Sequence, residues 1–502
     1  MDTTLKDYYD LVTPDAGAMI ETLRAFGYHF ETSIADIIDN SISAEAKNIW
    51  IDCLWNGEKS TVSITDDGHG MSEKILITAM RPGSKNPLQE RDDKDLGRFG
   101  LGLKTASFSQ CRRLTVGSKS EGNETAVRYW DLDYVNICGE WRLAKPNKEN
   151  TPRVFSTLDQ MKCGTIIFWE KIDRMTKGTD AENKKHKDHF LAQLDILKSH
   201  LEMVFHRFLT KPPGLKIILN GREIKPWDPF LSTHPSTQHL PVESVKYGGK
   251  RIIVHPFILP HRSKMDDDSY ETAGGPGGWN EQQGFYIYRN NRLIVPGDWL
   301  GLGFRKEQHT KLARIMVDIP NTFDGDWKID VKKSVARPPA LIKDEFRRIA
   351  RLTIEQAIDV YRYRGKANER NASSLSFPWS TSVQHGVYHY SINRNHPLVS
   401  DILQNAGVAK SKIQALLKLV EETVPVPLIV LNSSNNPDKI QIPFEGTPPE
   451  EMRSVLEEIW NSLISSGVSR ENAKTRLIHM EPFSDYPQFV AEFIRTKDTD
   501  VR

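Results

Sequence analysis

The chain has 502 residues, of which 38% are hydrophobic, and its formal net charge is +1. This length is sufficient for about three domains with cores of their own. The near-neutral charge excludes a protein that binds polyanions through net charge alone, so charge by itself predicts nothing about DNA.

Cysteine usage and hydropathy indicate the compartment. The four cysteines form no CxxC pair, so they predict neither a zinc site nor a disulfide framework, and we expect reduced thiols that serve in packing. No apolar run approaches the length of a membrane span, and the start MDTTLKDYYD lacks the charge pattern of a signal peptide. We therefore expect a cytoplasmic protein with no membrane partner.

The first motif is the segment IADIIDNSISA, in which apolar Ile34, Ile37 and Ile38 recur at helical spacing. Asp36 and Asn40 are four residues apart and project from one face of that helix. The amide oxygen of Asn40 suits Mg²⁺, and a carboxylate one turn earlier could polarise a water near a γ-phosphate. An ordinary solvated helix face would have the same pattern.

The second motif is TVSITDDGHGMS, an alternating strand that ends at Asp66. Gly68 and Gly70 permit a sharp exit from the strand and a close approach of a ligand. A carboxylate at a strand end can accept the exocyclic amine of adenine. The alternative is an ordinary Asp-Gly turn after a strand.

The third motif, GRFGLGLKT at residues 97–105, is a glycine-rich loop before a helix that we expect to begin near Leu103. Free N–H groups and the helix dipole at this point would face a phosphate, and Lys104 adds charge. The motif is not a P-loop, because Leu103 separates the last glycine from Lys104. It is not a dinucleotide fingerprint either, because Thr105 replaces the last glycine of that pattern.

In this order the three motifs resemble the GHKL ATPases, which include DNA gyrase B, MutL, MORC proteins, heat-shock chaperones and sensor histidine kinases. The segment KCGTIIFWE adds a fourth match, because Thr165 falls on the family's hydroxyl that binds adenine through water. The resemblance implies an α/β sandwich of the Bergerat type that binds ATP and Mg²⁺, with Asn40 as the metal ligand and Asp66 on the adenine. The nucleotide contacts that it implies are Asn40, Asp66, Gly68, Gly70, Met71, Ser84, Gly97, Phe99, Gly100, Leu101, Gly102, Leu103, Lys104 and Thr165.

The chain departs from the family at the catalytic base. Hydrolytic members usually place Glu four residues before the metal-binding Asn, whereas this chain has Asp36. Asp is one methylene shorter, so the carboxylate reaches less far toward a water. We expect slow hydrolysis with Asp36 as the base.

The remaining pattern predicts a domain order. We expect an ATPase domain at residues 1–210 that ends at a Pro-Pro-Gly signal, and a strand-rich α+β transducer domain at 211–365. Residues 366–502 are expected to form a mainly helical domain for partner binding or dimerisation, with the segment PLIVLN as buried strand and HGVYHYSINRNHP as loop.

Two further segments resemble the transducer of MutL and gyrase B. The segment YIYRNNRLI is similar to a transducer strand, or is a plain hairpin that turns at Asn290 and Asn291. In IDVKKSVARPP, Lys332 and Lys333 are the candidates for the transducer lysine that contacts the γ-phosphate, and we prefer Lys333.

These resemblances favour the MutL/MORC-like branch, including its bacterial forms associated with restriction and DNA defence. They imply an ATP-gated homodimeric clamp or switch in DNA repair, restriction or anti-phage defence, with DNA as a candidate partner. The alternatives are a chaperone-like ATPase, and a non-hydrolysing ATP sensor that scaffolds a nuclease or helicase.

Overall fold

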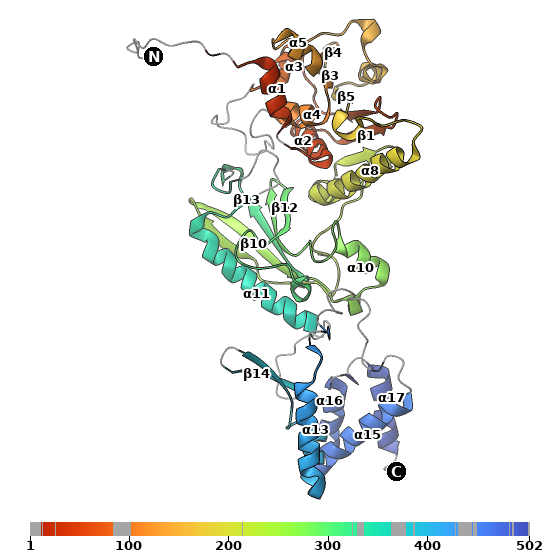
Figure 1. Ribbon diagram of the computed structural model, residues 1–502, viewed down its shortest axis with the longest axis vertical. Helices are drawn as coiled ribbons and strands as arrows, with labels where there is room; N and C mark the ends of the chain where they lie inside the picture. The colour runs from red at the N-terminus through yellow and green to blue at the C-terminus, as the bar shows by residue number, and fades with distance from the viewer. Residues whose placement is uncertain are drawn as a thin grey trace, which may run out of the picture. The chain divides into compact units, whose positions relative to one another are not determined.

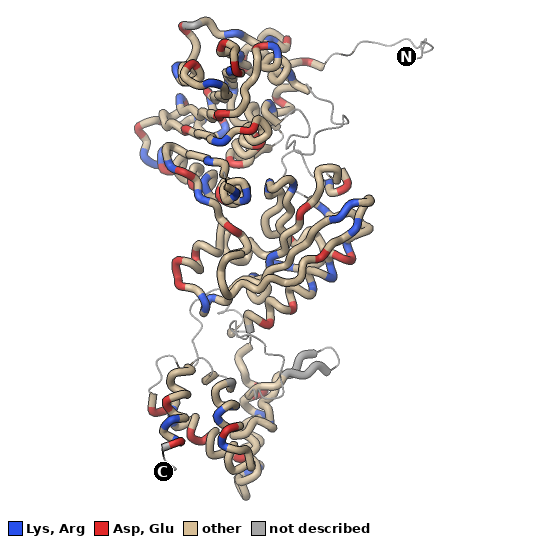
Figure 2. The backbone as a smooth tube through the Cα atoms, turned by 180° about the vertical axis from the view of Figure 1, so that it is seen from behind, with Lys and Arg blue, Asp and Glu red and all other residues tan. Residues whose placement is uncertain are grey.

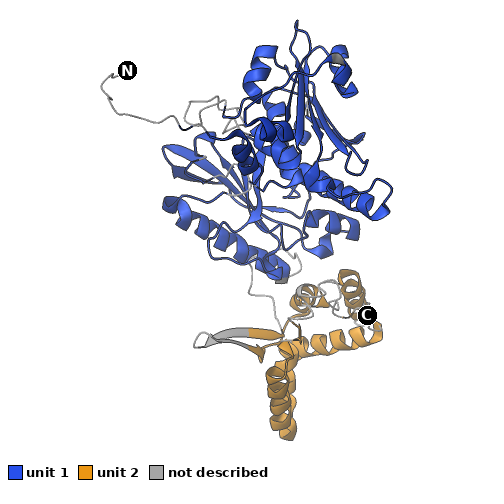
Figure 3. Cartoon of the chain, turned by 45° about the horizontal axis from the view of Figure 1, so that its top comes forward, with its two compact units in different colours: residues 1–366 blue, residues 367–502 orange. Residues whose placement is uncertain are grey.

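The computed structural model divides the chain into two compact units, residues 1–366 and 367–502 (Figure 3). The residues that it describes are 12, 14–25, 27–83, 102–212, 214–323, 325–328, 336–362, 378–384, 387–426, 428–429, 444, 449–480, 482–483 and 486–499.

The first sheet has seven strands in the order β4-β3-β5-β2-β1-β6-β7. Neighbouring strands are antiparallel, except that β1 and β6 are parallel. The strands are β1 Asn48–Leu54, β2 Thr61–Asp66, β3 Arg113–Lys119, β4 Ala126–Asp131, β5 Gly164–Glu170, β6 Lys216–Leu219 and β7 Arg222–Glu223.

Helices pack with this sheet (Figure 1). The α2 helix contributes Ile34, Ile37 and Ile38 to the main hydrophobic core, as their spacing predicts, whereas Leu158 of α6 lies in a smaller separate cluster with Phe155 and Ile166. The α8 helix contributes Leu197 and Leu201 to the main core. The helices are α1 Ala16–Arg24, α2 Phe30–Ser43, α3 Glu73–Met80, α4 Gly102–Gln110, α5 Leu132–Cys138, α6 Thr157–Gln160, α7 Asp173–Thr176, α8 Lys184–Val204 and α9 His206–Thr210.

The first sheet extends beyond residue 210, where the Pro-Pro-Gly signal led us to end the ATPase domain. The parallel pairing of β6 with β1 sets Lys216 against Asn48 and Leu219 against Ile51. A turn signal marks a change of chain direction, and it cannot indicate whether the next strand joins the old sheet or a new one. Residues 216–223 therefore belong to the first sheet.

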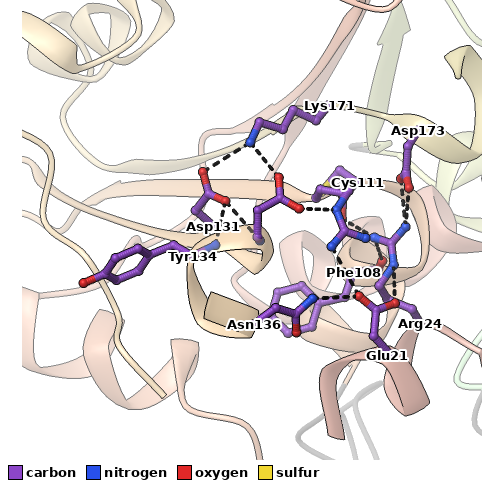
Figure 4. A network of polar contacts seen from close by, with 11 residues as sticks. Glu21, Arg24, Phe108, Cys111, Asp131, Tyr134, Asn136, Lys171 and Asp173 are labelled. Atoms are coloured by element: carbon purple, nitrogen blue, oxygen red, sulfur yellow. Dashed lines mark hydrogen bonds and ion pairs between the residues drawn. The ribbon is translucent and has the colours of Figure 1, made fainter. Parts of the chain in front are cut away.

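The buried guanidinium of Arg24 fixes α1 to the C-terminal end of α4 (Figure 4). Its Nη1 donates to the carbonyl oxygens of Phe108 and Cys111 at 2.7 and 2.8 Å. Its Nη2 donates to both carboxylate oxygens of Asp173 at 2.8 and 2.7 Å. Because the last carbonyls of a helix lack intrahelical partners, Arg24 completes the end of the helix that follows the glycine-rich loop.

The second sheet of residues 1–366 runs in the order β12-β11-β13-β10-β8, with β9 also paired to β10. Its elements are β8 Gln238–His239, β9 Glu243–Tyr247, β10 Lys250–Ile258, α10 Asp267–Gly274, β11 Gly284–Arg289, β12 Arg292–Asp298, β13 Ala313–Ile319 and α11 Lys343–Arg362. The α11 helix packs along β10 and β13 (Figure 1). It buries Phe346 and Ile349. The strand-rich character predicted for this region is confirmed.

The turn between β11 and β12 is the predicted asparagine hairpin. Asn290 and Asn291 have φ values of 47° and 65°, which asparagine tolerates better than most residues.

In the second unit, β14 Trp379–Gln384 pairs with β15 Val387–Ile392. The segment that we expected to be a loop around residues 385–397 therefore contains a strand. The prediction of a buried strand in PLIVLN is wrong at the two residues of that segment that the structure describes, because Leu428 and Ile429 are helical and exposed. The mainly helical character predicted for this region is confirmed. The described helices of the unit are α12 Pro397–Asn405, α13 Lys410–Glu422, α15 Pro449–Ser465, α16 Arg470–His479 and α17 Pro487–Thr499.

Lys and Arg are interspersed with Asp and Glu along both units (Figure 2). Among the described residues, no helix is both long enough and apolar enough to cross a membrane.

Candidate nucleotide site

The α2 helix carries the two residues that the first motif singled out. Asp36 is buried, and its Oδ2 accepts a hydrogen bond of 2.9 Å from the hydroxyl of Tyr28. Asn40, one turn later, is exposed, and its side-chain amide makes no hydrogen bond with the residues that the structure describes. The α2 helix thus presents the Asn40 amide, which has no hydrogen-bond partner among the described residues, one turn after the Asp36 carboxylate, which Tyr28 holds in place.

Strand register brings Asp66, Thr165 and Ser118 into one row across three strands. Asp66 of β2 lies directly opposite Thr165 of β5, and Thr165 lies opposite Ser118 of β3. Directly opposed residues project from the same face of a sheet, so the three side chains share one face. The hydroxyl oxygens of Ser118 and Thr165 are 2.9 Å apart.

The Asp66 carboxyl is buried and held in place from two sides. Its Oδ2 accepts from the Ser41 hydroxyl at 2.9 Å, and its Oδ1 accepts from the Gly68 N–H at 3.0 Å. Burial raises the pKa of this carboxyl above its ordinary value, while the hydrogen bonds from Gly68 and Ser41 oppose that rise. A carboxylate kept in this setting is a directed acceptor for a donor such as an exocyclic amine.

Ser118 organises the row and was not predicted from the sequence. Its Oγ accepts from the Met71 N–H at 2.8 Å and lies 3.1 Å from the carbonyl oxygen of Gly164. The hydroxyl thereby ties the turn after β2 to the start of β5, beside Thr165. Only strand register reveals this relation, and a single sequence contains no signal for register.

The turn after β2 requires glycine. Gly70 has φ +65°, and a Cβ atom there would collide with the carbonyl oxygen of Lys119. A Cβ atom at Gly68 would lie 2.8 Å from both Cβ and the carbonyl oxygen of Ala44, at the end of α2. We expected Gly68 and Gly70 to let a ligand approach closely. The fold itself also requires glycine at both positions, because neighbouring atoms of the chain leave no room for a Cβ atom.

The adjacent Asp67 has a structural task. Its Oδ1 accepts from the backbone N–H groups of Lys47 and Asn48 at 2.7 and 2.9 Å, and its Oδ2 accepts from Asn48 Nδ2 at 2.6 Å. The two aspartates of the second motif thus point to different partners, and Asp67 holds the loop between α2 and β1.

Part of the predicted phosphate loop can be described. The α4 helix begins at Gly102, one residue before the predicted start. Leu103 is half-buried. Lys104 is buried, and its Nζ donates to the carbonyl oxygen of Ala79 at 2.8 Å. The other predicted residues of this loop lie outside the described residues; they are Ser84, Gly97, Phe99, Gly100 and Leu101.

Lys332 and Lys333 also lie outside the described residues. The structure does describe a buried ion pair between α2, which packs with the first sheet, and β12 of the second sheet. Arg292 of β12 places Nε 3.0 Å from Oδ1 of Asp39, the residue before Asn40 in α2. The exposed fractions of the two side chains are 4% and 1%, so solvent does not screen the pair.

Two histidines, His200 and His206, have lowered pKa values, and the charges of Arg292 and Asp39 both act on His200. The Nε2 atom of His200 on α8 is buried without a hydrogen-bond partner among the described residues, and burial lowers its pKa to about 3, with the Arg292 charge adding to the effect. Burial lowers the pKa of His206 to about 4, and its Nε2 lies 2.8 Å from the Tyr288 hydroxyl of β11. Both side chains are therefore neutral at physiological pH.

The residues fit a Mg²⁺ ion that is held mainly by phosphates. Among the described residues, no group of three or more His, Cys, Asp or Glu side chains is placed to hold a metal. The exposed amide of Asn40 supplies one neutral oxygen, and Mg²⁺ commonly takes one or two protein ligands, several waters and substrate phosphates.

Comparison with known proteins identifies the fold of this site. A family profile described as histidine kinase-, DNA gyrase B- and HSP90-like ATPase matches residues 28–165. The ATPase morc-1 of Caenorhabditis elegans is 30% identical over 96 residues, which are 19% of this chain and 11% of the relative. The mismatch repair protein MutL of Coxiella burnetii (strain Dugway 5J108-111) is 31% identical over 103 residues, which are 20% of this chain and 18% of the relative.

The chaperone protein HtpG of Bacillus velezensis is 34% identical over 105 residues, which are 19% of this chain and 16% of the relative. The matched part of the chain thus spans between 11% and 18% of the length of these three relatives. All three belong to the predicted superfamily. Residues 28–165 of this chain are therefore a GHKL ATPase module, in a protein that continues with further α/β and helical regions.

Proposed function

We propose that this module binds ATP with Mg²⁺ and hydrolyses it slowly. The observation that carries the proposal is the row of Asp66, Thr165 and Ser118 on one face of three strands. The α2 helix is tied to this row through the hydrogen bond from Ser41, the residue after the exposed Asn40, to Asp66. The row would receive adenine through the Asp66 carboxylate and the Thr165 hydroxyl. The Asn40 amide oxygen would hold Mg²⁺, whose chemistry is to neutralise charge on the phosphate oxygens.

In the proposed step, a water oxygen bonds to the γ-phosphorus and passes a proton to the Asp36 carboxylate. The bond from the γ-phosphorus to the β,γ-bridging oxygen breaks, and its electron pair leaves with ADP. The products are ADP and inorganic phosphate. The short side chain of Asp36 limits its reach to the water, which is why we expect a low rate.

The test is hydrolysis of ATP by the wild-type chain and by Asp36→Ala, Asp36→Glu and Asn40→Ala. We expect Asp36→Ala to lose hydrolysis while it still binds a non-hydrolysable ATP analogue. Equal rates for Asp36→Ala and the wild type would show that Asp36 is not the base. Analogue binding without any wild-type turnover would favour the second reading, a nucleotide sensor that scaffolds a nuclease or helicase.

We further propose that the whole chain acts as an ATP-gated dimeric switch on DNA, in repair, restriction or defence. Its relatives include a mismatch repair protein and a MORC ATPase. The chain also offers a basic surface, the β9–β10 hairpin, where Lys246, Lys250 and Arg251 are exposed and form no ion pair with any described residue. Cations left unpaired on a surface can release counterions from a phosphate backbone.

The DNA proposal is tested by binding of the wild type and of two triple alanine variants at several salt concentrations, with ATP analogue present. The first variant replaces Lys246, Lys250 and Arg251. The control replaces three exposed lysines at the start of α8, which removes the same charge; they are Lys184, Lys185 and Lys187. We expect weaker binding and a shallower salt dependence for the first variant alone, and dimerisation that requires the analogue in all three.

The similarity to HtpG supports a chaperone-like ATPase as the other candidate. This reading predicts suppression of aggregation of an unfolded client, with no effect of DNA on ATP turnover. A chain that stays monomeric with bound analogue and never retains DNA would contradict the switch.

A further inference from the structure

We propose that Tyr28 is the positioning residue for the Asp36 carboxylate, and that it sets which oxygen of this carboxylate meets the attacking water. The inference rests on the proposed hydrolysis. Its direct support is the hydrogen bond of 2.9 Å from the Tyr28 hydroxyl to Asp36 Oδ2. The residues are 6% and 3% exposed, so water competes little for this contact.

The rest of Tyr28 is also fixed, from the helix that follows the phosphate loop. Gln110, the last residue of α4, donates through Nε2 to the carbonyl oxygen of Tyr28 at 2.9 Å. The same Nε2 lies 3.0 Å from the hydroxyl oxygen of Ser33, which itself donates to the carbonyl oxygen of His29. The phenol therefore projects from a backbone that α4 and the first turn of α2 hold together.

This contact is important because the chain has Asp36 where hydrolytic members of the family usually have Glu. An aspartate has two side-chain torsions, and its carboxylate plane is set by the second of them. A glutamate could compensate for a small displacement with its additional torsion, whereas an aspartate depends on its neighbours for orientation. A donor on Oδ2 fixes the carboxylate plane before substrate arrives, and a misplacement of about 1 Å can cost on the order of 100-fold in rate.

A positioning role makes a prediction that a purely structural role does not. Tyr28→Phe removes one oxygen and keeps the ring. We expect kcat to fall by about tenfold, as for other partners that orient a reacting group, with the KM for ATP and the affinity for a non-hydrolysable analogue within about twofold of wild type. The matched control is Tyr134→Phe, which removes a hydroxyl from an exposed tyrosine of α5 and should leave kcat unchanged.

The decisive measurement is a double-variant cycle in one ATPase assay. If Tyr28 acts by orienting the Asp36 carboxylate, Tyr28→Phe should lower kcat less in an Asp36→Glu background than in the wild type, because the additional torsion of glutamate compensates for the lost contact. Independent, multiplying effects would overturn the proposal, and so would a Tyr28→Phe variant that keeps the wild-type kcat or that changes only KM.

The same assay separates this proposal from the proposed function. If the wild type and Asp36→Ala hydrolyse ATP equally, the base assignment fails and the role of Tyr28 fails with it. If Asp36→Ala loses activity and Tyr28→Phe does not, only the positioning role is overturned. Analogue binding by each variant establishes that its nucleotide site is folded.

Discussion

The guanidinium of Arg292 contacts the carboxylate of Asp39 at 3.0 Å, and this buried ion pair joins the helix of the nucleotide site to the hairpin of the second sheet. Arg292→Ala would remove the cationic partner of a carboxylate whose side chain is 1% exposed. We therefore expect Arg292→Ala to lower the free energy of unfolding by about 3–5 kcal/mol, measured by chemical denaturation followed through tryptophan fluorescence.

The control for this loss is Arg142→Ala. The side chains of Arg142 and its ion-pair partner Glu140 are both exposed, so this substitution should not change the denaturation midpoint. The double variant Asp39→Asn with Arg292→Met removes both charges and should recover part of the lost stability. An Arg292→Ala chain as stable as Arg142→Ala would contradict the importance of the pair.

Asn40→Ala should separate metal-dependent nucleotide binding from stability. Asn40 is exposed and its side chain makes no hydrogen bond with a described residue, so we expect its replacement to change the free energy of unfolding by less than about 0.5 kcal/mol. Binding of an ATP analogue measured by calorimetry should lose its dependence on Mg²⁺. A variant that binds the analogue with the wild-type response to added EDTA would exclude Asn40 as a ligand.

The raised pKa of Asp66 makes a prediction about pH. Because burial favours the neutral carboxyl, Asp66 takes up its proton at a higher pH than an exposed aspartate would, and the protonated form is a poorer acceptor for the adenine amine. ATP affinity should therefore weaken as the pH falls on the acid side of neutrality. Asp66→Asn should bind at least tenfold more weakly at neutral pH.

Asp66→Asn also controls for protonation of the ATP phosphates, because these phosphates titrate equally in the experiments with the variant and with the wild type. The difference in affinity between wild type and Asp66→Asn should shrink as the pH falls. A constant difference between pH 7 and pH 4 would argue against adenine recognition by the ionised carboxylate.

Ser118→Ala should weaken nucleotide binding through Thr165. The change leaves the Met71 N–H without its acceptor, at a cost of about 1–3 kcal/mol, and removes the hydroxyl beside Thr165. We expect analogue affinity to fall by about tenfold. The matched control is Thr115→Val on the same strand, since the buried Thr115 hydroxyl has no hydrogen-bond partner among the described residues; its affinity should equal that of the wild type.

The buried imidazole of His200 predicts acid sensitivity. Its pKa is about 3 in the folded protein and about 6.5 when unfolded, so between these values the unfolded chain binds a proton that the folded chain does not. Stability should thus fall as the pH decreases from 6.5 toward 3. The melting temperature of His200→Met should drop less between pH 7 and pH 5 than that of the wild type.

His189→Met provides the comparison, because His189 is exposed on the same helix. Its melting temperature should follow the wild-type pH dependence. Identical slopes for all three proteins would indicate that His200 does not contribute to acid sensitivity.

The sequence predicts those parts of the module that depend on local chemistry. The apolar spacing in α2, the strand that ends at Asp66 and the start of α4 near Leu103 all follow from patterns within about ten residues. These patterns suffice because helix and strand periodicity are local properties.

What could not be predicted depends on contacts between distant segments. The role of Ser118 requires the register of β3 against β5, and the pairing of Arg292 with Asp39 joins residues 253 positions apart. The helical state of Leu428 and Ile429 also differs from the expected strand, because a short apolar run does not distinguish the two structures. Nothing in a single sequence specifies these relations.

The parallel pairing of β6 with β1 has a practical consequence for any shortened form of this protein. A fragment that ended at residue 210 would leave the backbone of β1 unpaired along the side that β6 occupies, next to the core residues Ile49 and Ile51. An unprotected strand edge beside apolar side chains is a template for aggregation. A fragment that continues through β7 keeps that edge covered, so its solubility should exceed that of the shorter one by a margin visible in ordinary expression trials.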